Sequence, residues 1–188
     1  MIFSDFQELE TSRLRLRRLR LEDVPAYFTR LGSSHNVTKC MLWQPHKDIS
    51  ESAASIRKVL HRYEEGSCCR WGIALKSDDS LIGIIELLHF DEKANTCGFA
   101  YMLGEDFWGC GYGTEALKAA LAFAFGTLHV SAVIADHFEE NPASGAVMRK
   151  AGMRFIRMIP ERYEKNGRKH NALEYRITRA DWDSRTRH

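Results

Sequence analysis

Three glycines occupy every second position just before a long apolar stretch, in FWGCGYGTEALKAALAFAF, residues 107 to 125. Ser, Thr, Asp or Asn caps a helix better than glycine does. Gly109, Gly111 and Gly113 therefore indicate a special backbone shape or the close approach of a ligand. Backbone N–H groups at a glycine-lined helix start form a concave site for phosphate oxygens. The stretch predicts a site for a pyrophosphate-bearing ligand.

Two known phosphate-binding motifs share part of this pattern. A P-loop needs lysine where this chain has Cys110, so that motif is absent. The dinucleotide fingerprint GxGxxA is present as Gly111, Gly113 and Ala116, with Asp136 at a suitable distance. That fingerprint also needs a strand ending just before its first glycine and a parallel β–α–β unit. An antiparallel pattern precedes the run here, which weakens the dinucleotide interpretation.

A carboxylate in an apolar strand is the main candidate for a general base. Glu86 interrupts LIGIIELLHF, and strand alternation places it among the apolar residues of one face. Burial there is expected to raise the pKa of the carboxyl group, which suits a base. Alternatively, a twist or bulge near Gly83 brings Glu86 to solvent or to an arginine. His89 and His137 are reserve bases, or ordinary strand histidines.

The remaining reactive side chains give weaker indications. Five cysteines, at 40, 68, 69, 97 and 110, follow no zinc-ligand spacing, so we expect free, mostly buried thiols and no metal site. Only Cys110 lies near a helix start, and a catalytic role for it is a weak alternative. Glu115 lies in the first turn of the same helix, where the helix dipole favours a carboxylate. We expect Glu115 to be structural or substrate-facing.

The composition is that of one globular domain over residues 1–188, with 44% hydrophobic residues and a formal net charge of +2. This charge requires no polyanionic partner, so we expect no nucleic acid binding. Leu14 and Leu16 alternate with arginines, as in a strand with one buried and one solvated face. The chain shows no signal peptide and no apolar stretch of membrane-spanning length. We expect a soluble, cytoplasmic protein without a membrane partner.

Helices and antiparallel strands alternate around these residues. Turn signals and caps predict strands near 13–17 and at 69–77, 81–90, 96–103 and 130–138, and a hairpin of 153–163 with 170–178 around Asn166 and Gly167. They predict helices at 22–31, 48–66, about 112–126 and 141–152. The fold class is therefore α+β, with a mixed, mostly antiparallel sheet of about six to seven strands and about four helices.

Four blocks, in this order, carry a family resemblance: ETSRLRLRRLRLEDVPAY, FAYML, FWGCGYGTEAL and NPASGAVMRKAGM. Together they resemble the Gcn5-related N-acetyltransferases (GNAT), and the first block resembles their RimJ/RimL branch. The resemblance spans about residues 10–178 and leaves short tails. It implies a GNAT-like fold whose sheet is splayed at the cofactor site. The sequence does not distinguish a monomer from a homodimer.

The resemblance implies an acetyl-CoA-dependent N-acetyltransferase acting on a primary amine. A protein or peptide N-terminal α-amine is slightly favoured over a small-molecule amine such as an antibiotic or polyamine. A non-catalytic CoA-binding regulatory module is a further alternative. An α-amino group titrates near ~8 and a lysine near ~10.4, so an N-terminal acceptor demands less of a base.

The resemblance also implies roles for individual residues. The pyrophosphate lies on backbone amides of the glycine run, and a backbone N–H near Met102 or Leu103 stabilises the oxyanion. Trp108 stands where relatives commonly carry Arg or Gln, which predicts a packing role for it. The implied cofactor-binding residues are Tyr101, Met102, Leu103, Trp108, Gly109, Cys110, Gly111, Tyr112, Gly113, Thr114, Asn141 and Ser144.

The predicted catalytic residues are Glu86, chosen from its position in the strand, and Ser144, which the resemblance implies. Many relatives carry a tyrosine acid four residues after Ser144, where this chain has Met148, so Ser144 or a water it holds becomes the candidate acid. Asn141 and Ser144 also fit a purely structural role in the first turn of their helix. Trp43 and Glu86 are implied at the acceptor site, where Trp43 either stacks on a substrate or fills the core. The charges of the last hairpin, Lys165, Arg168 and Lys169, are expected to form a solvated turn.

Overall fold

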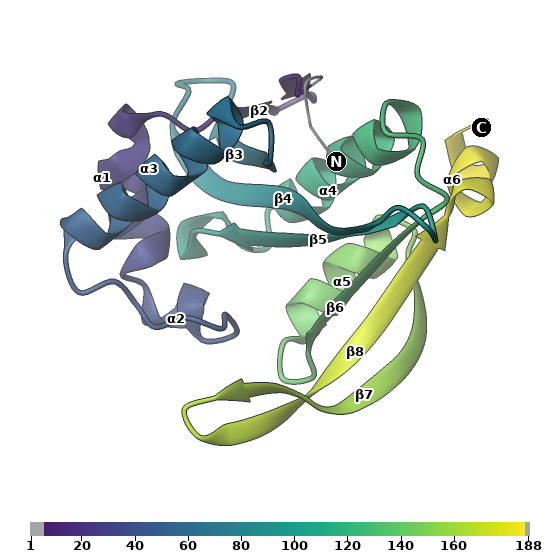
Figure 1. Cartoon of the computed structure of the whole chain (residues 1–188). Helices are drawn as coiled ribbons and strands as arrows, with labels where there is room; N and C mark the ends of the chain where they lie inside the picture. The colour runs from purple at the N-terminus through teal and green to yellow at the C-terminus, as the bar shows by residue number, and fades with distance from the viewer. Residues whose placement is uncertain (1–5, 187–188) are drawn as a thin grey trace.

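The computed structural model of the chain describes residues 6–186, and all strands in this part join one sheet. The eight strands lie in the order β1-β2-β3-β4-β5-β6-β8-β7 (Figure 1). Their bounds are β1 (Leu9–Glu10), β2 (Leu14–Arg17), β3 (Cys69–Leu75), β4 (Leu81–Asp91), β5 (Thr96–Leu103), β6 (Ala132–Phe138), β7 (Arg154–Lys165) and β8 (Arg168–Thr178). The α-helices are α1 (Val24–Tyr27), α2 (His35–Thr38), α3 (Ile49–Glu64), α4 (Tyr112–Gly126), α5 (Pro142–Lys150) and α6 (Arg179–Thr186).

The sheet confirms the α+β class, and its element counts exceed the prediction. The described chain has eight strands against the expected six to seven, partly because β1 has two residues. It has six α-helices against about four, because α2 and α6 were not predicted. The expected helix at 22–31 is a run of 3₁₀, α and π turns from Leu21 to Gly32.

The sheet opens between β5 and β6. Strands β3, β4 and β5 form the predicted antiparallel meander, in which Arg70, Glu86 and Ala100 lie side by side. In the described chain, β5 and β6 pair in parallel only at Thr96 with Ala132 and at Cys97 with Val133. Beyond these pairs the two strands diverge. The splayed sheet expected from the family resemblance is therefore present.

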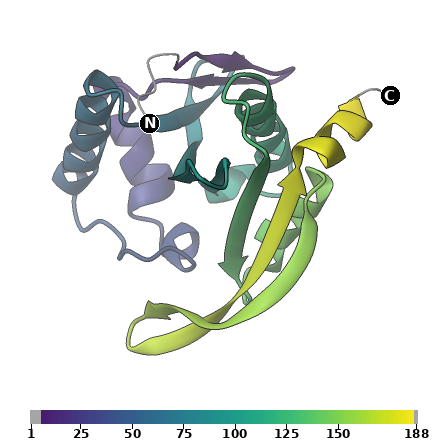
Figure 2. The same cartoon turned by 45° about the vertical axis from the view of Figure 1, so that its right-hand side comes forward.

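Helices cover both faces of the sheet (Figures 1 and 2). Helices α4 and α5 pack with one apolar cluster that includes Trp71, Leu117 and Phe125. Helices α1 and α3 belong to a second cluster on the other face, which includes Ile56. The hairpin of β7 and β8 extends past the end of β6 toward the loop that follows α2 (Figure 2).

The basic N-terminal strand differs in one respect from the prediction. Leu14 and Leu16 are fully buried, as expected. Arg17, however, is also buried, because its guanidinium group binds both carboxylate oxygens of Asp23 at 2.9 Å and the Asp79 carboxylate at 3.1 Å. The prediction of a wholly solvated arginine face was therefore wrong at Arg17. No helix in residues 6–186 is long and apolar enough to cross a membrane.

Candidate active site

Two adjoining cavities occupy the region where β5 and β6 diverge. The first has a volume of about 480 Å³ and is lined by the glycine run, the end of β5 and helix α5. The second has a volume of about 680 Å³ and is lined by β5, β6, the hairpin and the loop after α2. The residues that line both are Cys40, Met41, Tyr101, Asn141 and Ser144. Predicted cofactor residues thus lie at the junction of two spaces.

The three glycines of the run meet different requirements. Gly109 and Gly111 have φ angles of 74° and 84°, a region in which other residues are strained. Gly113 has no such angle, but a Cβ atom there would lie 3.3 Å from Leu103 and 3.4 Å from Tyr101. The first two glycines therefore shape the loop, and the third allows α4 to pack closely on β5.

The start of α4 can bind an anion. The amides of Tyr112, Gly113 and Thr114 lie in the first turn, where no intrahelical carbonyl is available to them. The helix dipole adds partial positive charge at the same end. Gly109, Gly111, Gly113 and Thr114 line the first cavity. This arrangement suits a phosphate group and fits the prediction made from the glycine spacing.

Arg13 anchors the turn after β1 beside this loop, a role that strand periodicity did not indicate. Its guanidinium group donates to the Cys110 carbonyl at 3.0 Å and binds Glu115 at 2.7 Å. Glu115 also accepts hydrogen bonds from Thr11 and Ser12. Burial raises the pKa of Glu115, but hydrogen bonds from Thr11, Arg13 and Ser12 outweigh it and leave this pKa below its ordinary value. Glu115 is structural here, one of the two roles expected for it.

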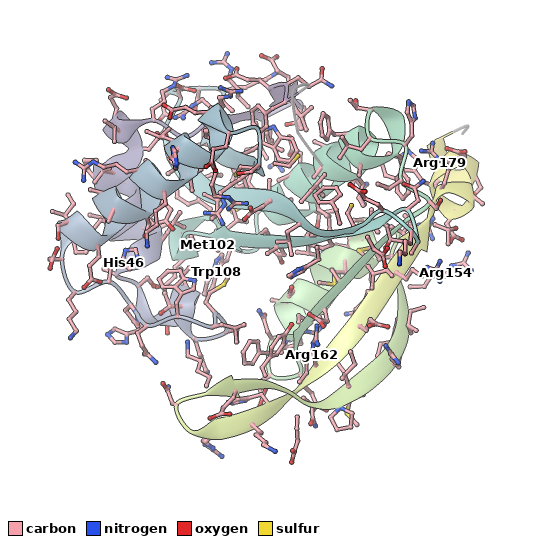
Figure 3. The ribbon with its side chains drawn as sticks, in the orientation of Figure 1. His46, Met102, Trp108, Arg154, Arg162 and Arg179 are labelled. Atoms are coloured by element: carbon pink, nitrogen blue, oxygen red, sulfur yellow. The ribbon has the colours of Figure 1, made fainter. Side chains whose placement is uncertain are left out.

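Trp108 is held by a hydrogen bond and not by burial. Its indole Nε1 donates to the Leu103 carbonyl at 2.8 Å, while half of the side chain remains exposed. Trp108 lines the first cavity near the end of β5, on the side of Met102 (Figure 3). The expected packing role therefore takes the form of a wall fixed to β5.

Ser144 lies beside a tyrosine hydroxyl at the junction of the cavities. The side-chain oxygen of Asn141 accepts a hydrogen bond from the Ser144 amide at 3.3 Å, so Asn141 caps α5. Burial raises the pKa of Tyr101, and a hydrogen bond with the Ser144 side chain acts in the opposite direction. Ser144 is itself buried. Tyr101 was expected only as a neighbour of the cofactor, and its contact with Ser144 could not be predicted from separation in sequence.

The register of β5 distinguishes the two candidate oxyanion donors. The Gly104 amide binds the Ile82 carbonyl at 2.9 Å, and Leu103 lies opposite Gly83. Since N–H groups alternate in direction along a strand, the Met102 amide faces β4 and the Leu103 amide faces the open side. The hydrogen bond from Trp108 to the Leu103 carbonyl agrees with this direction. The geometry therefore favours the Leu103 amide over the Met102 amide as the oxyanion donor.

Glu86 is buried and ion-paired. Arg70 Nε lies 2.8 Å from Oε2 and Arg62 lies 3.1 Å from Oε1. The thiol of Cys68 is 3.9 Å from the same carboxylate. In the described chain Glu86 lines neither cavity. Of the predicted alternatives, the structure shows the one in which Glu86 meets arginine. Both oxygens are engaged, so accepting a proton from an amine requires breaking an ion pair.

Both reserve histidines line the second cavity. His89 has a φ angle of 52° and is exposed, within an irregular part of β4. His137 is buried, and its Nδ1 donates to the Phe138 carbonyl at 2.7 Å. Its Nε2 has no partner within residues 6–186 and lies against Gly145 of α5. Burial holds the pKa of His137 below its ordinary value, so the ring is neutral at pH 7.

Trp43 combines the two roles expected for it as alternatives. The indole packs against the second apolar cluster, and its ring centroid lies 5.1 Å from that of His46 in a tilted arrangement. It also lines the second cavity, together with Met41 and Leu42. Trp43 can therefore contact an acceptor in the cavity while it packs against the second apolar cluster.

The cysteines are free thiols, as predicted. Cys68, Cys69 and Cys97 are buried, Cys40 is half-buried and Cys110 is exposed.

Comparisons with known proteins identify the family. A family model described as the Acetyltransferase (GNAT) domain matches residues 13–154. The chain therefore belongs to the GNAT acetyltransferases and is an N-acetyltransferase. The uncharacterized N-acetyltransferase p20 of Bacillus licheniformis is 30% identical over 138 residues, which cover 73% of this chain and 77% of that protein. The structure of a GNAT-family acetyltransferase from Bacillus anthracis has a TM-score of 0.82 at 20% identity, covering 93% and 99% of the two chains.

More distant relatives carry names that include an acceptor. The ribosomal protein uS5-alanine N-acetyltransferase of Escherichia coli is 23% identical over 116 residues, 58% of this chain and 60% of that protein. The spermidine N(1)-acetyltransferase of the same organism is 22% identical over 160 residues, 85% of this chain and 83% of that protein. Family membership replaces the dinucleotide interpretation of the glycine run and leaves the acceptor class open.

Proposed function

We propose that the chain transfers the acetyl group of acetyl-CoA to a primary amine, as a RimJ/RimL-like enzyme. The donor is assigned to the first cavity and the acceptor to the second. The observation that carries this proposal is the position of Ser144 and Tyr101, which line both cavities where they adjoin. The free amides at the start of α4 support the assignment of the pyrophosphate to the first cavity.

In this proposal, acetyl-CoA supplies the acetyl group and a thiolate leaving group. The amine nitrogen bonds to the carbonyl carbon as the carbon–sulfur bond breaks, the amine loses a proton and the thiolate gains one. The Leu103 amide faces the carbonyl oxygen and stabilises the charge that develops on it. Ser144, whose hydroxyl is oriented by Tyr101, donates its proton to sulfur and regains one from water of the second cavity. The water-accessible second cavity receives the proton lost by the amine.

The base need not be Glu86. We propose that Glu86 holds Arg62 and Arg70 in place, because both of its oxygens are engaged. An α-amino group with a pKa near ~8 is partly neutral at physiological pH, so water can remove the proton after attack. The sequence slightly favours such an acceptor over a small-molecule amine. The relatives named for ribosomal protein uS5-alanine and for spermidine support a protein acceptor and a small-molecule acceptor, respectively.

A thiol-release assay over a panel of primary amines, with calorimetric titration of acetyl-CoA, tests the proposed function. Ser144→Ala is expected to lower kcat by about 10²-fold, the scale of general acid catalysis, with little change in the Kd of acetyl-CoA. Tyr101→Phe is expected to lower kcat in the same direction by a smaller factor. Ser184→Ala, on the exposed face of α6, is the control.

Failure to bind acetyl-CoA would refute the assignment of the donor cavity. Binding without turnover of any amine, and without an effect of Ser144→Ala, would favour the non-catalytic CoA-binding module instead.

A further inference from the structure

Lys165 at the hairpin tip was expected to be solvated, and this prediction was wrong. Its ammonium group donates to the carbonyls of Thr38, Met41 and Trp43, at 2.7, 2.5 and 3.1 Å. An ammonium group has three N–H donors, and the three backbone carbonyls accept one hydrogen bond from each. We call this contact the Lys165 bridge.

The turn that follows Lys165 fixes its direction. Asn166 and Gly167 have φ angles of 52° and 71°, which is the geometry of a tight two-residue hairpin turn. Asn166 adds a second link, because its side-chain oxygen accepts a hydrogen bond from Gln44 Nε2 at 2.5 Å. The hairpin tip is therefore joined to the loop after α2 by two neighbouring residues.

The bridge joins two walls of the second cavity. Met41 and Trp43, whose carbonyls it binds, line that cavity from the loop after α2. Arg162 and Tyr163 line it from β7, on the hairpin. Figure 3 shows the position of Arg162. Both hairpin side chains are held in turn by Asp136 of β6, with Arg162 Nε 3.3 Å from its carboxylate. The wall is thus continuous from the loop to the hairpin and on to the sheet.

We infer that the Lys165 bridge closes one side of the acceptor cavity and makes the enzyme selective for small primary amines over the N-termini of folded proteins. This inference rests on the proposed function, which places the acceptor in the second cavity. The cavity volume of about 680 Å³ is that of a small-molecule site. On this side of the cavity a polypeptide whose terminus reached the space would meet the bridged loop and hairpin, whereas a small amine would fit within the cavity volume. The structure thus favours the small-molecule alternative over the acceptor slightly preferred from sequence.

Lysine suits this role better than arginine. Its three donors diverge from one atom, whereas the planar fork of arginine matches carboxylates and phosphates. Partial burial against the loop lowers the pKa of Lys165, in agreement with a group withdrawn from solvent. Lys169, on the other strand of the hairpin, binds Glu161 at 2.5 Å and remains exposed.

The test compares Lys165→Met with Lys169→Met, which removes a charge from the same hairpin and leaves the bridge. The acceptors are alanine amide, a small α-amine, and a small folded protein with a free, unblocked N-terminal alanine, both assayed at saturating acetyl-CoA. The wild type is expected to prefer alanine amide. Lys165→Met is expected to reduce the ratio of kcat/KM for the small amine to kcat/KM for the protein by about tenfold or more, since hydrogen bonds from a charged donor are lost. Lys169→Met should keep the wild-type ratio.

Hydrogen exchange provides an independent readout, because amides 39–47 should exchange faster in Lys165→Met if the bridge orders this loop. Gln44→Ala, which removes the second link and keeps the lysine, should shift the acceptor ratio in the same direction by less. A wild type that prefers the protein acceptor overturns the inference, as does an unchanged ratio when amides 39–47 exchange faster. Absence of turnover with either acceptor, in a chain that binds acetyl-CoA, overturns the proposed function and this inference with it.

Discussion

Replacing Gly111 by alanine separates loop shape from general stability. The φ angle of Gly111 is 84°, and an added Cβ would lie 3.4 Å from the Arg13 guanidinium group, an ordinary contact distance. The cost is therefore backbone strain of about 1–2 kcal/mol. Reduced freedom of the unfolded chain offsets about 0.4–1 kcal/mol of it. We expect a net loss of about 1 kcal/mol, which lowers Tm by about 3 °C in a chain of this size.

The effect on the donor should be larger. Relaxing Gly111 toward a negative φ turns the peptide that follows it and moves the Tyr112 amide away from the phosphate position. One lost hydrogen bond to a charged group costs about 1.5–3 kcal/mol. The Kd of acetyl-CoA should then rise by about tenfold or more, since each 1.4 kcal/mol is a factor of ten. Calorimetric titration at 25 °C, where the variant stays folded, measures this change separately from thermal unfolding.

Gly126→Ala is the matched control at the other end of α4. Its Cβ would meet no atom of residues 6–186 within 4 Å, so alanine should stabilise the helix by about 0.5 kcal/mol and leave the Kd unchanged. Wild-type affinity in Gly111→Ala would refute the phosphate assignment. So would an equal loss of affinity in Gly126→Ala. Either result would indicate that Gly111 has a purely structural role.

Two further substitutions test carboxylates near the site. Glu86→Gln should lower the free energy of unfolding by about 2 kcal/mol, because two partly exposed arginines lose their partner. It should preserve the pH profile of kcat/KM, and a large loss of rate at unchanged stability would instead identify Glu86 as the base. Glu115→Gln should destabilise the protein by about 2 kcal/mol at pH 7. Because the folded pKa of Glu115 is lowered, its contribution is full above the unfolded pKa near ~4.3 and is lost as pH falls through the folded value. Urea unfolding from pH 7 into acid measures this, and a difference that persists in acid would contradict it.

Much of the fold follows from local patterns. The helix predicted at about 112–126 is α4 at Tyr112–Gly126, since its dense apolar pattern and glycine entrance are both local signals. The hairpin turn at Asn166 and Gly167 was predicted because this dipeptide accepts positive φ angles. Helix α2 and strand β1 escaped prediction because elements of four and two residues depend on tertiary contacts for their stability.

Some residues of the candidate site could be predicted from local sequence, and others depended on tertiary packing. Asn141 and Ser144 could be placed from a cap and a helix start within one short stretch. Glu86 could be placed in a strand, but the arginines that hold it come from α3 and β3, so its environment depended on how those elements pack. Lys165 could be placed beside a turn, but its three acceptors lie more than 120 residues away in the chain.

The sequence by itself determined the family, the order of the elements and the glycine loop, because each is encoded in contiguous residues whose spacing sets backbone shape. Only the tertiary structure decided which charges are free. From the sequence alone, Arg17 and Lys165 resemble solvated side chains, and Glu86 resembles a reactive base. Each is neutralised or bound by groups from other elements, and ionic and hydrogen-bonding partners depend on distance in space and not on separation along the chain.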